Sequence, residues 1–124
     1  MAARNPEEFH RLFAEAFSAG NLDALMNLYE PTAKLISQPG QPAVSGQAIR
    51  EGLRGFLALK PTIAIETESV VKTEDLALLR SKWTLRGVGP DGKPIEMTHR
   101  GAEVLRRQPD GTWRLVIDHP FGAD

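Results

Sequence analysis

The spacing of apolar residues changes once along this 124-residue chain, near Pro61, and this change limits the folds that are open to it. Before Pro61, apolar residues recur every three to four positions, which is the period of an amphipathic helix. After it, β-branched residues recur with partial alternation, which is typical of strands. Helices first and strands last predict an α+β fold whose helices pack on one face of a sheet.

The first half predicts three helices and one short strand. Asn5 can cap the first helix and Gly20 ends it, while Pro31 should stop the second. The expected helices span residues 6–19, 22–29 and 47–59. A short strand is expected at 32–37, and the stretch 38–46 reads as a loop because it holds two prolines and two glycines.

The second half predicts four long strands joined by tight turns. Asp-Gly pairs at 91–92 and 110–111 are hairpin signals. The expected strands span residues 62–72, 75–87, 94–107 and 112–119. We therefore expect a curved antiparallel sheet wrapped around three N-terminal helices in a single domain, residues 1–124, with a pocket between the two layers.

Alternation along a strand assigns its side chains to two faces. On the strand at 75–87, the odd-numbered residues from Ala77 to Leu85 should face the helices. The strand at 94–107 leaves two choices open. Either the set that holds His99 and Glu103 or the alternate set could face inward, and a β-bulge could switch between them.

On the last strand the apolar set favours one choice. Trp113, Leu115 and Ile117 alternate, which places His119 on the inner face and Asp118 on the outer face. Apolar residues are also expected among the arginines of the outer face, at Leu78, Val104 and Val116. An outer face of this kind predicts a homodimer formed through it, and the alternative is a scatter of isolated surface residues.

Composition and charge exclude several function classes. The net charge of −1 gives no electrostatic reason to expect nucleic acid or a membrane surface as a partner. The absence of cysteine excludes disulfides, thiolate catalysis and cysteine zinc sites. His10 should be exposed on the first helix, and no histidine spacing typical of a metal site is present, so no metal or other cofactor is expected. The first residues lack a long apolar run, which predicts the cytoplasm.

Three residues on the last two strands are candidates for acid–base catalysis. Histidine as a residue type gains and loses a proton near neutral pH, so His99 or His119 could act as a general base. Glu103 or Asp118 could fix the ring of one of them by a hydrogen bond, and the favoured alternative for Asp118 is an outward-pointing cap of the last strand. The alternative for each histidine is a structural role, with its ring bonded to a backbone carbonyl or another polar partner.

Four large side chains are candidates for a ligand-binding wall. They are Phe17, Tyr29, Trp83 and Met97. Such a wall would suit a flat, hydrophobic ligand. Tyr29 and Trp83 are the stronger candidates, because each carries a polar atom that needs a partner. The alternative, favoured for Phe17, is that these side chains only fill the core.

The element order and three segments resemble the nuclear transport factor 2-like superfamily, in its SnoaL-like polyketide cyclase and ketosteroid isomerase-like branch. The segments are the run AGNLDALMNLYEP at 19–31, the stretch Gly46 to Arg50, and the run DGTWRLVIDH from Asp110 to His119. The resemblance implies a cone-shaped fold with an internal pocket. The last run is also similar to the association domain of a calcium/calmodulin-dependent kinase, so the fold alone does not decide the function.

The resemblance leaves three functions to compare. The first is a cofactor-independent acid–base enzyme, of isomerase, cyclase or hydrolase type, acting on an apolar, carbonyl-bearing small molecule. The second is a non-catalytic module that binds a small hydrophobic molecule or dimerises, and the third is an assembly domain. Ketosteroid isomerase chemistry needs an aspartate base facing a tyrosine and a protonated aspartate. This chain has one tyrosine and no aspartate expected on the inner face, so the same mechanism is not expected.

Overall fold

A computed structural model describes residues 2–124. A short 3₁₀ turn at Pro6–Glu8 leads into the first helix, with Asn5 accepting a hydrogen bond from the Glu8 amide as the sequence suggests. The helices are α1 (Phe9–Ser18), α2 (Leu22–Met26) and α3 (Gln47–Leu57). The strands are β1 (Tyr29–Leu35), β2 (Thr62–Thr73), β3 (Leu76–Val88), β4 (Pro94–Arg107) and β5 (Trp113–His119).

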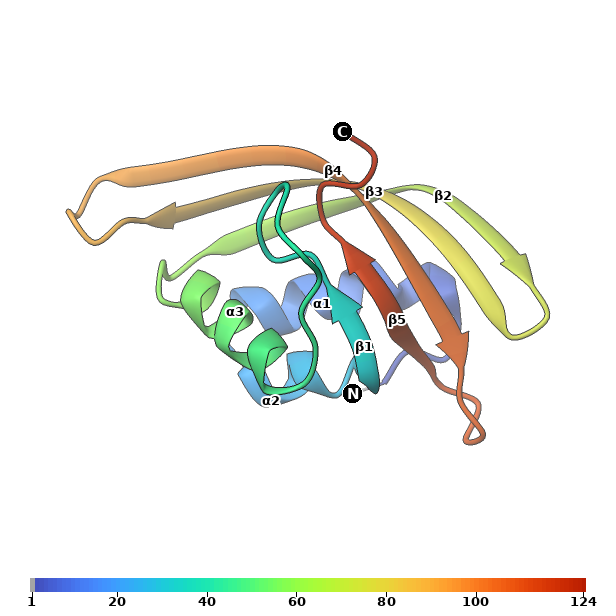
Figure 1. The fold of residues 1–124 in the computed structure, drawn as a ribbon. Helices are drawn as coiled ribbons and strands as arrows, with labels where there is room; N and C mark the ends of the chain where they lie inside the picture. The colour runs from blue at the N-terminus through green and yellow to red at the C-terminus, as the bar shows by residue number, and fades with distance from the viewer. Residues whose placement is uncertain (1) are drawn as a thin grey trace.

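The strands form one sheet in the order β1-β5-β4-β3-β2. The strands from β2 to β5 pair antiparallel with their neighbours in sequence, and β1 joins the edge in parallel to β5. Figure 1 shows a strongly curved sheet with the three helices on its concave side. The predicted α+β fold with a curved sheet around three helices is confirmed.

The boundary after α2 differs from the prediction. The helix ends at Met26, and Tyr29, predicted to lie at its end, begins β1 with its side chain buried. Pro31 lies inside this strand instead of stopping a helix. Proline is tolerated there because β1 is an edge strand, where one row of backbone groups has no ladder partner.

Burial shows which residues of β3 and β4 face the helices. On β3 the residues Ala77, Leu79, Ser81, Trp83 and Leu85 are buried, which confirms the predicted set. On β4, where two facings were possible from the sequence, the set that holds His99 and Glu103 faces inward. Its members become progressively more buried toward the C-terminal end of the strand.

A β-bulge in β5 overturns the predicted facing of the last strand. Leu105 pairs with Leu115 and Val104 with Ile117, so Val116 is the extra residue. Beyond Val116, the residues that face the helices are therefore shifted by one position along the strand. Ile117 is 44% exposed on the outer face, and Asp118 turns inward with 6% exposure.

The outer face carries exposed apolar side chains, Ile117 and the predicted Leu78 among them, while Val104 and Val116 are half-buried. The homodimer through this face stays a prediction. No helix within residues 2–124 is both long and apolar enough to cross a membrane.

Candidate functional site

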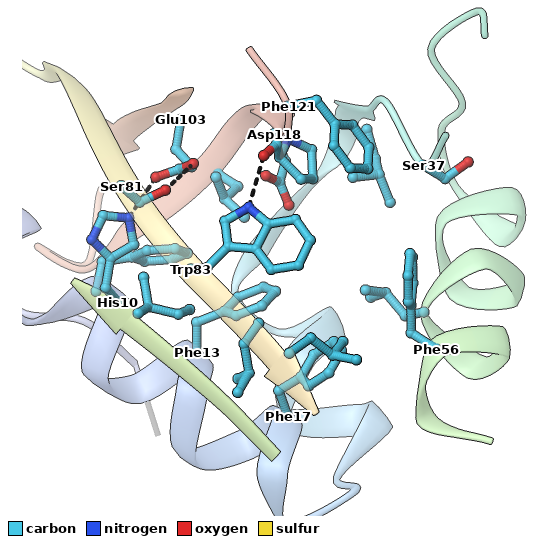
Figure 2. Close-up of a pocket in the computed structure, with 18 residues that line it drawn as sticks. His10, Phe13, Phe17, Ser37, Phe56, Ser81, Trp83, Glu103, Asp118 and Phe121 are labelled. Atoms are coloured by element: carbon cyan, nitrogen blue, oxygen red, sulfur yellow. Dashed lines mark hydrogen bonds and ion pairs between the residues drawn. The ribbon is translucent and has the colours of Figure 1, made fainter. Parts of the chain in front are cut away.

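A cavity of about 70 Å³ lies between the concave face of the sheet and the helices α1 and α3. Its wall is mainly apolar, and aliphatic side chains alternate there with the aromatic rings of Phe9, Phe13, Phe17, Phe56, Trp83 and Phe121. Figure 2 shows Trp83 in the middle of this group, with Phe56 and Ser37 across the open space on one side and His10, Ser81 and Glu103 on the other. The polar lining comes from His10, Ser37, Ser81, Glu103 and Asp118.

Glu103 is held on the inner face of β4 by two hydrogen bonds. Its Oε1 lies 2.5 Å from Nε2 of His10, and its Oε2 accepts a bond of 3.0 Å from the Ser81 hydroxyl. The side chain is 6% exposed. The Glu103 carboxylate therefore has a donor at each oxygen, as a buried charge requires.

His10 projects from α1 onto the sheet, where it is 4% exposed. Its Nδ1 lies 2.6 Å from the Thr67 hydroxyl, so both ring nitrogens have partners. The prediction that His10 is exposed is therefore wrong. His10 lies three positions before Phe13 and seven before Phe17, and this helical spacing already places it on the apolar stripe.

Gly101 makes room for the bonds of Glu103. A Cβ at this position would lie 2.5 Å from Oε2 of Glu103 and 2.8 Å from the Ser81 hydroxyl. Ser81 and Gly101 are direct partners across β3 and β4. The missing side chain at 101 thus leaves the notch that the carboxylate and the hydroxyl share.

Asp118 is the second carboxylate of the cavity. Its Oδ2 accepts a 2.6 Å bond from the hydroxyl of Tyr29, which comes from the start of β1. Burial, and then repulsion from Glu103, raise the pKa of Asp118 to about 7, although the Tyr29 bond acts in the opposite direction. Burial, followed by the negative charge of Asp118, raises the pKa of Tyr29 well above its ordinary value, so its hydroxyl stays a donor.

Glu103 and Asp118 face each other directly on the neighbouring strands β4 and β5. Two carboxyl groups this close resist ionising together, so one tends to keep its proton. The partner of His10 is the one stabilised as a carboxylate, which leaves Asp118 to gain and lose a proton near neutral pH. This arrangement can give and take a proton at an otherwise apolar wall.

The raised pKa of Asp118 predicts a pH-dependent stability. Because the folded chain holds this proton more tightly than the unfolded chain, the contribution is full below about pH 4 and is lost as pH rises to about 7. The Asp118→Asn substitution removes this pH-dependent contribution to stability. Relative to the wild type, the unfolding free energy of this variant should rise by about 2–4 kcal/mol between pH 4 and 8. Urea titrations at each pH measure it, and a constant difference would contradict the assignment.

The predicted catalytic residues are only partly brought together. Glu103 lines the cavity, as expected. The ring of His99 instead packs against Phe121 and Trp83, and its Nδ1 bonds Asp124 at 2.7 Å. His119 follows the inward Asp118 and so turns outward, which overturns its predicted facing, and its ring lies against Gly122.

Two of the four predicted ligand-binding residues line the cavity and two do not. Phe17 and Trp83 line the cavity. Tyr29 lies behind Asp118 and contacts the cavity through it, while Met97 is half-buried farther along β4 and is outside the lining. Among residues 2–124, no three histidine or acidic side chains gather as a metal site would require.

Comparison with known proteins agrees with this architecture. The model of the SnoaL-like domain family matches residues 9–116. No curated protein matches the chain. A ketosteroid isomerase-like protein from Erwinia carotovora atroseptica superimposes with a TM-score of 0.73 at 23% identity, covering 90% of this chain and 88% of that chain.

Two further solved structures resemble it. A proposed dehydratase of the NTF2-like family from Streptomyces avermitilis has a TM-score of 0.74 at 22% identity, covering 91% of this chain and 90% of that one. A proposed calcium/calmodulin-dependent protein kinase II association domain from Xanthomonas campestris has a TM-score of 0.80 at 22% identity, covering 91% and 81%. At these identities the likeness shows the fold alone. Since the family model spans most of the chain, this chain belongs to the SnoaL-like domain family.

Proposed function

We propose that the chain is a cofactor-independent acid–base enzyme that moves a proton next to the carbonyl group of a small apolar molecule. The observation that carries the proposal is the directly opposed pair Glu103 and Asp118, both buried and both facing one aromatic cavity. Relatives of this fold named as a dehydratase and as isomerase-like support the same class of chemistry.

Asp118 is the proposed proton-transferring residue. As a carboxylate it would take a proton from the carbon next to the carbonyl, leaving an enolate. As the resulting carboxylic acid it would return that proton to the same carbon or to another atom of the substrate. A pKa of about 7 keeps both forms of Asp118 populated near neutral pH, which is the condition for efficient transfer.

The remaining polar groups would hold Asp118 and control its charge. Tyr29 fixes one oxygen of the carboxyl group, so the other is directed to the substrate. His10 and Ser81 hold the charge of Glu103 in place beside it. This fixed negative charge disfavours the ionised form of Asp118 and so makes it a stronger base once it is ionised.

The lining also limits the charge of the substrate. Two carboxyl groups face the cavity, and none of its described lining residues is lysine or arginine. A buried anion would therefore meet like charge without a compensating cation. We propose a neutral ketone or aldehyde as substrate and expect carboxylate-bearing analogues to be excluded.

Deuterium exchange tests the reaction without knowledge of the natural substrate. The protein should catalyse incorporation of deuterium next to the carbonyl of cyclohexanone in D₂O, measured by NMR. The rate should rise with pH and level off above an apparent pKa near 7, the pKa of Asp118. Saturable binding of cyclohexanone without exchange above the buffer rate would contradict the enzyme and favour a non-catalytic binding module.

A further inference from the structure

The segment Pro120–Asp124, here called the strap, forms one wall of the cavity. It leaves the sheet after β5 and turns back across the inner face, so that Pro120 and Phe121 join the cavity lining. Figure 2 shows Phe121 at the side of the cavity that lies between Trp83 and Ser37. Most of the other walls belong to helices or to paired strands, whereas the strap is a single turn.

The first half of the strap rests on Trp83. The indole Nε1 donates a 2.7 Å hydrogen bond to the carbonyl oxygen of Pro120. The Phe121 ring meets Trp83 nearly edge-on, with centroids 6.0 Å apart, and meets His99 at 5.0 Å and 88°. Phe121 therefore packs against two rings of the sheet, whose centroids lie 5.3 Å apart, and also lines the cavity.

Asp124 joins the second half of the strap to β4 by hydrogen bonds. Its Oδ2 lies 2.7 Å from Nδ1 of His99, and its Oδ1 accepts a 2.7 Å bond from the amide of Arg100. The amide of Ala123 donates in return to the carbonyl of Arg100 at 3.0 Å. The Arg100 amide and then His99 lower the pKa of Asp124, so it is ionised at neutral pH. These bonds are at the surface, with the Asp124 side chain 43% exposed.

The cavity is small for a cyclic substrate. Its volume is about 70 Å³, whereas an engineered protein cavity that binds benzene measures about 150 Å³. A cyclic substrate therefore needs more room than this form of the cavity gives. The end of the strap is attached through surface hydrogen bonds, which open more readily than packed helices or central strands.

We propose that the strap opens as a unit to admit the substrate, that Asp124 is its latch, and that Phe121 sets the size of molecule the cavity accepts. The role of Phe121 in substrate choice rests on the function proposed above. The opening itself is a property of the chain alone and can be measured without any ligand.

Hydrogen exchange of the Trp83 indole N–H, followed by NMR, tests the latch. Asp124→Ala removes the bonds to His99 and to the Arg100 amide, so the open form should gain population and exchange should speed up about tenfold. Asp110→Ala is the matched control. Asp110 also accepts bonds from a backbone amide and a side chain, both of Thr112, but in the distant β4–β5 turn. It should leave Trp83 exchange unchanged.

Two results would overturn the latch. One is wild-type exchange of the Trp83 indole N–H in Asp124→Ala. The other is a rise shared equally by core amides such as that of Leu115, since this would report global unfolding instead of local opening. Neither result would bear on proton transfer by Asp118, so the two proposals fail separately.

Phe121→Ala tests the control of substrate size. Removing this ring should raise the affinity for the two-ring ketone 2-tetralone, relative to the one-ring cyclohexanone, by about tenfold. Calorimetric titration measures both affinities. Phe9→Leu is the matched control, because Phe9 also lines the cavity but lies on α1. An unchanged affinity ratio in Phe121→Ala would show that another wall sets the size limit.

Discussion

Asp118→Asn is expected to slow deuterium exchange into cyclohexanone by about 10²–10⁴-fold, the contribution that a positioned acid or base usually makes. Asparagine keeps the shape of the side chain, and its carbonyl oxygen can still accept the bond from Tyr29. It cannot take a proton from carbon. The loss should therefore appear in kcat with little change in KM, because the substrate contacts of the wall remain.

The control for this variant is Asp91→Asn. Asp91 is an exposed aspartate whose carboxylate accepts the amide of Lys93 in the β3–β4 turn, so exchange should keep its wild-type rate. A second check is the pH profile, since the limb near pH 7 should vanish from any residual activity of Asp118→Asn. Full activity in Asp118→Asn would transfer the proton-moving role to another group.

His10→Leu is expected to lower the unfolding free energy by about 3–5 kcal/mol, the usual result of removing the partner of a buried carboxylate. The carboxylate of Glu103 would stay buried with Ser81 as its remaining donor, and the Thr67 hydroxyl would lose its partner. Urea unfolding at pH 7 measures the loss.

A double variant separates loss of the pair from loss of packing. In His10→Leu with Glu103→Leu, no buried charge remains at this position, so stability should recover most of the way toward the wild type. The same substitution at His99, whose partner Asp124 is exposed, should remove only about 1 kcal/mol or less through its ion pair. Equal losses in His10→Leu and in the double variant would mean that packing, and not the charge, explains the effect.

The fold follows from the sequence because its signals are local and repeated. The alternation on β3 alone assigns Trp83 and Ser81 to the inner face, and the Asp-Gly pairs place the turns at both ends of β4. The edge position of β1 results from a long-range pairing with β5, so no local pattern shows that Pro31 can lie inside a strand. Tyr29 was accordingly expected in a helix.

The candidate site was harder to predict, for two different reasons. His10 carried a usable signal, since its spacing to Phe13 and Phe17 places it on the buried stripe, but a polar residue on such a stripe is easily assigned to solvent. For the inward facing of Asp118 there was no such signal in the sequence. Its facing depends on a bulge that leaves the apolar alternation of Trp113, Leu115 and Ile117 unbroken in the sequence, even though Ile117 is exposed in the fold.

The bulge in β5 has a consequence for how proteins of this architecture can diverge. Val116 is the extra residue that sets the phase of the strand beyond it. Deleting Val116 would remove the bulge and leave Asp118 facing the cavity, because Leu115 and Ile117 would keep their partners on β4. Losing the bulge while keeping every residue would instead restore simple alternation, turn Asp118 to the outer face and bring His119 to the inner face. Strand register alone thus decides whether a carboxylate or an imidazole stands at the reacting position, so the chemistry of this sheet can change without any change at that position itself.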